Sequence, residues 1–109
     1  MTDPEAYVDP DDTLRLLRDL VRIDSVNPGL VDGAAGETEL AAHVAGELRD
    51  AGLEVETREA TPGRVSVVGR LRGDLGAGPS FMLNAHTDTV GVEGMEDPFS
   101  GELRDGRVY

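Results

Sequence analysis

The chain has 109 residues and a formal net charge of −12, because 22 acidic residues outnumber ten basic ones. This charge repels nucleic acids and anionic membrane surfaces, so the composition argues against both as partners. There is no cysteine and no run of 18 apolar residues, which excludes a disulfide framework and a membrane span. The acidic start of the chain has no apolar stretch behind it, so we expect a cytoplasmic location.

Two amphipathic helices are predicted in the first half of the chain, after a loose tail at residues 1–8. Asp9 suits the position that caps a helix and Pro10 suits the first helical position, and apolar residues then recur at helical spacing to about residue 23. A loop rich in glycine and proline occupies residues 24–36. The second helix is expected over residues 37–51, with Gly52 as its C-terminal stop.

Strands are predicted in the second half. Residues 53–59 and 64–72 form an expected antiparallel pair around Pro62 and Gly63. Residues 80–86 are continuously apolar at their centre, which is typical of a strand covered on both faces. A short hairpin over residues 102–109 turns at Asp105 and Gly106. The order predicts an α/β fold in which helices pack on a mixed sheet, and the sheet is expected to be incomplete.

The residues best placed for chemistry follow the last of these strands. His86 comes directly after the apolar run, and Asp88 lies two residues further on, so both side chains would point to one side of an extended segment. An imidazole nitrogen can bind zinc, and a carboxylate can accept the hydrogen bond of the other ring nitrogen. A loop histidine paired with its neighbour explains the same spacing, and on spacing alone this second interpretation is favoured.

Other polar clusters are interpreted as surface. His43 lies on the acidic face of the second helix, which indicates a solvated face rather than a cation site. Glu93, Glu96 and Asp97 lie on a loop without histidine and are expected to be ordinary surface residues. The glycines of residues 73–79 are not followed by the lysine of a phosphate-binding loop.

Residues 83–90 resemble the first metal-site motif of the M20 metallopeptidase family. Residues 23–28 resemble that family's N-terminal helix end and its Ser-x-Asn-Pro turn, residues 36–39 and 48–55 the following helix and strand, and residues 97–109 the approach to its second motif. The resemblance covers nearly the whole chain in the right order. Two departures are Gly91, where the family often has proline, and the absence of tryptophan.

The resemblance implies a zinc-dependent amidohydrolase or peptidase that acts on an N-acyl amino acid or a small peptide. His86 would be a ligand of one metal in a site for two zinc or cobalt ions, and Asp88 would orient this histidine and support catalysis. The family's other ligands, its general base and its dimerisation domain follow the matched segments, so a homodimer is one of the states open to the complete enzyme.

We therefore expect residues 1–109 to be the N-terminal portion of an M20-type catalytic domain, inactive in isolation and without a dimerisation domain. A non-catalytic interaction module and a decayed product of such an enzyme are the alternatives.

Overall fold

The computed structural model describes residues 7–109 and divides the chain into two compact units. The first unit combines the chain up to Asp24 with Val92–Tyr109, and the second is Ser25–Gly91. Most of the predicted tail lies outside the described residues, and its last two residues, Tyr7 and Val8, are exposed. Neither helix of the described part is long and apolar enough to cross a membrane.

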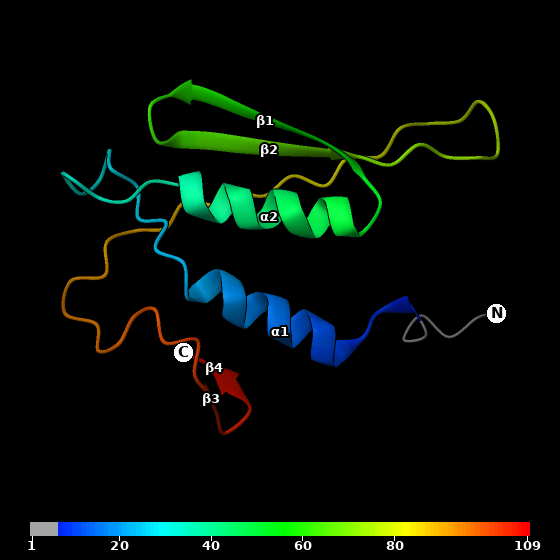
Figure 1. Cartoon of the computed structure of the whole chain (residues 1–109). Coiled ribbons are helices and arrows are strands. Elements are labelled where there is room, and N and C mark those ends of the chain that lie inside the picture. Colours follow the sequence, from blue (N-terminus) through cyan, green and yellow to red (C-terminus); the bar gives the residue numbers. More distant parts are fainter. Residues whose placement is uncertain (1–6) are drawn as a thin grey trace. The chain divides into compact units, whose positions relative to one another are not determined.

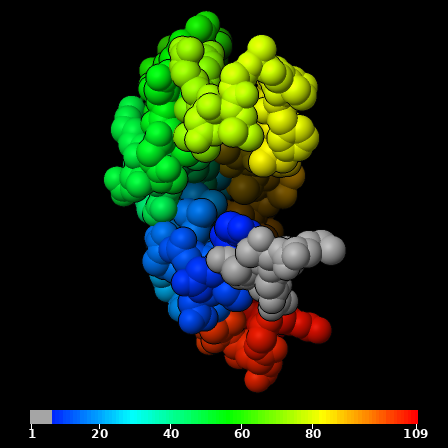
Figure 2. Space-filling model, turned by 90° about the vertical axis from the view of Figure 1, so that its right-hand side faces the viewer, coloured from blue at the N-terminus to red at the C-terminus, as the bar shows by residue number. Residues whose placement is uncertain are grey.

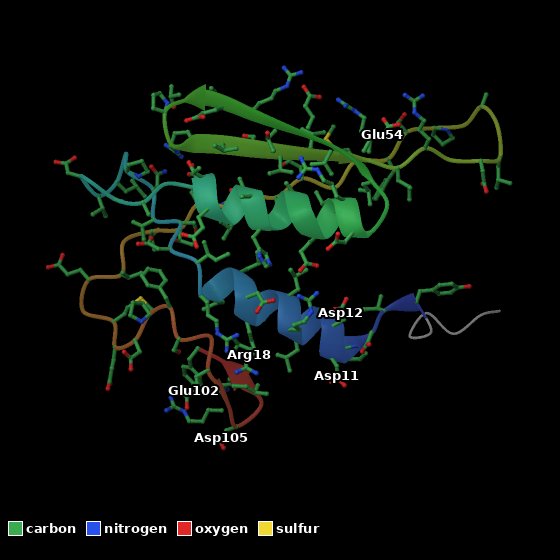
Figure 3. All side chains as sticks on the ribbon, in the orientation of Figure 1. Asp11, Asp12, Arg18, Glu54, Glu102 and Asp105 are labelled. Carbon is green, nitrogen blue, oxygen red and sulfur yellow. The ribbon has the colours of Figure 1, made fainter. Side chains whose placement is uncertain are left out.

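The first unit contains helix α1, Pro10–Val21, and the C-terminal hairpin (Figure 1). The predicted helix start is confirmed, because Asp9 Oδ1 accepts a hydrogen bond from the Asp11 N–H at 2.9 Å and Pro10 opens the helix. Asp11 and Asp12 lie in its first turn (Figure 3), where acids complement the helix dipole. The helix ends two residues earlier than residue 23.

The predicted hairpin at the C-terminal end is confirmed. Strand β3, Leu103–Arg104, pairs antiparallel with β4, Arg107–Val108, on either side of the Asp-Gly turn. Arg18 of α1 (labelled in Figure 3) donates a hydrogen bond from Nε to the Gly101 carbonyl at 2.7 Å. This bond ties the helix to the segment that leads into the hairpin.

The second unit packs helix α2, Thr38–Asp50, on an antiparallel hairpin of β1, Glu54–Thr61, and β2, Arg64–Arg70 (Figure 1). Leu40, Ala41 and Ala45 of α2 are buried, which agrees with the prediction that this helix is amphipathic. The helix stop is also confirmed, because the N–H groups of Gly52 and Leu53 bond back to the carbonyls of Arg49 and Leu48 at 2.9 and 3.0 Å.

The turn between β1 and β2 docks on the start of α2. The Glu37 N–H donates to the Gly63 carbonyl at 3.0 Å, and the Arg64 Nε donates to both carboxylate oxygens of Glu37 at 2.8 and 3.0 Å. Glu37 is only 4% exposed, so its charge needs this partner. Gly36 makes the approach possible, because a Cβ atom there would lie 2.4 Å from the Gly63 oxygen.

The prediction of a strand at residues 80–86 is wrong, and so is the single mixed sheet. The sheets of the described residues are two separate antiparallel pairs. Phe81, Met82 and Leu83 are 88%, 80% and 87% exposed, and the yellow residues of this segment lie on the surface in Figure 2. A strand of this composition needs neighbours for both edges and both faces, and residues 7–109 provide none for it.

Candidate functional site

The candidate site lies in the second unit, where two distant segments run side by side. The Asn27 N–H donates to the Thr89 carbonyl, and the Thr89 N–H donates to the Ser25 carbonyl, both at 3.0 Å, which makes a parallel bridge between Val26 and Thr89. Ser25 and Val26 are 2% and 5% exposed. A buried backbone segment therefore fixes the position of the residues next to Thr89.

The structure brings His86 and Asp88 together, as their spacing predicted. His86 Nδ1 lies 3.1 Å from Asp88 Oδ1 and 2.9 Å from the Asp88 backbone oxygen. Both neighbours are acceptors, so in the neutral imidazole Nδ1 carries the proton and Nε2 keeps a free lone pair. The His86 side chain is 86% exposed, and Nε2 makes no hydrogen bond to any described residue. This is the arrangement of a histidine that can bind a metal ion through Nε2.

Asn27 is a member of the site that the sequence interpretation missed. Its Nδ2 donates to Asp88 Oδ2 at 2.8 Å, while its Oδ1 accepts the Gly29 N–H at 2.7 Å. The Asn-Pro-Gly order signals such a side-chain turn. The sequence offered no signal for the contact with Asp88, because the two residues are 61 positions apart.

Hydrogen bonding favours the charged form of Asp88. The bond from Asn27 is the largest cause that holds the pKa of this carboxyl below its ordinary value of 3.8; partial desolvation opposes it, and the bond from His86 adds to it. The pKa of Arg64 is raised mainly by its hydrogen bond to Glu37, and the charge of Asp88 is the smallest of the causes that raise it. The site thus presents an ionised carboxylate next to an exposed imidazole.

The remaining candidate residues do not extend this site. Among residues 7–109, no further histidine or acidic side chain lies close enough to His86 and Asp88 to bind a metal ion together with them. Glu93, Glu96 and Asp97 are exposed, as expected for surface residues. The prediction of a solvated His43 needs correction: its side chain is only 31% exposed and Nε2 lies 3.6 Å from Glu47 Oε1, because the next helical turn brings this carboxylate alongside.

Comparison with known proteins gives one informative result. No family model matches the chain, and no solved structure matches it. The chain is similar to a succinyl-diaminopimelate desuccinylase from Methylobacterium radiotolerans. The two are 34% identical over 114 aligned positions, which cover 97% of this chain and 26% of that protein. The chain thus spans about a quarter of the length of this relative.

Proposed function

We propose that this chain is part of a metal-dependent amidohydrolase of the M20 type, in which His86 is a metal ligand. The observation that carries the proposal is the hydrogen-bonding geometry of His86: two oxygen acceptors face Nδ1, and Nε2 of this exposed side chain has no hydrogen-bond partner among residues 7–109. The partial likeness to a desuccinylase supports it. The substrate class is an N-acyl amino acid or small peptide, and a succinyl amide is the form that the relative's name indicates.

The donor set of the site fits part of a zinc site. A catalytic zinc typically takes about three protein ligands and keeps one open position. His86 provides one nitrogen ligand and Asp88 the carboxylate that supports it, so in this proposal the other ligands come from outside residues 7–109. The chemistry that a metal held there would supply is polarisation of the amide carbonyl and activation of water. This chain's own part is to hold the imidazole proton on Nδ1 and to stabilise its partial positive charge with the Asp88 carboxylate.

A zinc titration followed by NMR tests the proposal. We expect the ring protons of His86 to shift with added zinc, and the shift to be absent in His86→Ala and retained in the control His43→Ala. The affinity should be weak, because metal affinity depends on several ligands acting together. Zinc that perturbs only His43 would overturn the assignment of the ligand.

Activity provides a second test. We expect the 109-residue chain to release no amino acid from N-acetyl or N-succinyl substrates, with or without zinc, because the general base of the family has no counterpart in this site. Turnover that disappears in His86→Ala would show that these residues form a complete site.

An interaction module is the second candidate function, and the exposed apolar side chains of Phe81, Met82 and Leu83 favour it. Such a module would bind a partner through this segment and would not need His86. If partner binding were lost in Phe81→Ser, and zinc had no effect on His86, this second function would replace the first.

A further inference from the structure

Asp88 is held on both sides of its carboxylate. One oxygen, Oδ1, faces His86 Nδ1 at 3.1 Å, and the other, Oδ2, accepts the amide of Asn27 at 2.8 Å. An aspartate side chain exchanges readily between χ1 rotamers and about its last torsion angle unless hydrogen bonds fix it. The bond from Asn27 therefore restrains both the χ1 rotamer of Asp88 and the plane of its carboxylate, with one oxygen towards the imidazole.

Asn27 is itself fixed at four atoms. Its backbone N–H donates to Thr89, and its backbone oxygen accepts the N–H groups of Leu30 and Val31 at 3.0 and 3.1 Å. Its side-chain Oδ1 accepts the Gly29 N–H at 2.7 Å. Because Oδ1 is occupied in this way, the amide nitrogen is the end that faces Asp88, and the donor cannot turn away without breaking the bond to Gly29.

We infer that Asn27 is a positioning residue for the metal ligand His86, acting through the carboxylate of Asp88. The inference rests on the proposed function, because Asn27 positions a metal ligand only if His86 binds a metal. The hydrogen bonds among Asn27, Asp88 and His86 do not themselves depend on a metal. Replacing a residue that orients a metal ligand through hydrogen bonds typically lowers metal affinity by about 10- to 100-fold.

The substitution that isolates this role is Asn27→Asp. It keeps the size of the side chain and the oxygen that accepts the Gly29 N–H, and it replaces only the donor that faces Asp88. Asn84→Asp is the matched control, because it adds the same charge at an exposed position in the segment that carries His86. Asn27→Ser is a neutral second variant: its hydroxyl can still accept the Gly29 N–H, but it is too short to reach Asp88.

The first readout is the rotamer of Asp88, measured by its Hα–Hβ couplings in the metal-free chain. We expect the couplings of one staggered rotamer in the wild type and in Asn84→Asp, and averaged couplings in both Asn27 variants. Unchanged amide protection of Ala41 and Ala45 would show that the second unit remains folded. The tautomer of His86 is not used for this purpose, because the Asp88 backbone oxygen also faces Nδ1.

The second readout is the apparent zinc affinity of His86 from the same NMR titration. We expect it to fall at least about tenfold in the Asn27 variants and to stay within about twofold in Asn84→Asp. Wild-type couplings and affinity in a folded Asn27→Asp would overturn the inference and leave the proposed function standing. If zinc does not bind to wild-type His86, the proposed function fails, and the couplings still decide the role of Asn27.

Discussion

The close approach of Gly36 to the hairpin turn makes a quantitative prediction. Gly36 has a φ of 70°, and a Cβ atom at this position would lie 2.4 Å from the Gly63 oxygen. Alanine in the left-handed region costs about 1–2 kcal/mol, offset by about 0.4–1 kcal/mol because alanine restricts the unfolded chain. Relief of the clash must also displace the turn, and the hydrogen bond from Glu37 to Gly63 is worth about 1 kcal/mol. We expect Gly36→Ala to lower the free energy of unfolding by about 1.5–2 kcal/mol, from a net backbone cost of about 0.5–1 kcal/mol and the hydrogen bond.

Gly33→Ala is the control, because Gly33 has a φ of 75° with no atom within 4 Å of the added Cβ. It carries the backbone cost alone, so we expect a loss of only about 0.5–1 kcal/mol. Urea unfolding followed by far-UV circular dichroism, together with amide exchange of Ala41 and Ala45 as probes of the second unit, measures both. Equal losses in the two variants would refute the argument that the approach of Gly36 to Gly63 stabilises this unit.

Three further outcomes are expected. Leu40→Ala should destabilise the second unit by about 2–4 kcal/mol in urea unfolding, because Leu40 is 6% exposed, whereas Leu75→Ala, at a position 98% exposed, should change stability by less than about 0.5 kcal/mol. Phe81→Ser should reduce self-association in light scattering without loss of stability, and association that is unaffected would show that this segment is not responsible. Asn27→Ala should raise the pKa of the Asp88 carboxyl, measured by carbon NMR, towards its ordinary value of 3.8. The lowered pKa of Asp88 stabilises the folded protein at a pH above the pKa of the unfolded chain, and this stability is lost as the pH falls through the pKa of the folded state. Asn27→Ala should therefore lose less stability than the wild type as the pH falls through this range. Equal losses in the two proteins would contradict the role given to the bond from Asn27.

Local signals in the sequence predicted the helices and hairpins. Asp9 and Pro10 start α1, and Gly52 ends α2, through contacts within a few residues along the chain. The Asp105-Gly106 turn likewise fixes a hairpin through its own backbone preference. Each of these elements depends on neighbours in sequence, so their positions could be predicted to within about two residues.

The strand at residues 80–86 shows where such prediction ends. The apolar composition of this segment indicates a preference for burial. Whether it pairs as a strand depends on which other segments lie beside it, and composition does not specify those segments. The same limit applies to the site. The spacing of His86 and Asp88 predicted their contact, whereas Asn27 reaches Asp88 only because the chain folds back at Thr89.

This long-range contact also determines when the site can form during folding. Closing a flexible loop between Asn27 and Asp88, which are 61 positions apart, costs about 3.6 kcal/mol in its length-dependent part. Folding of α2 and the β1–β2 hairpin inside that loop shortens the distance to be closed. We therefore expect the site to assemble after them, and to slow when they are destabilised. A substitution in α2 that touches neither His86 nor Asp88 should then delay their meeting, so the rate at which the site appears reports on the stability of the helix and hairpin between them.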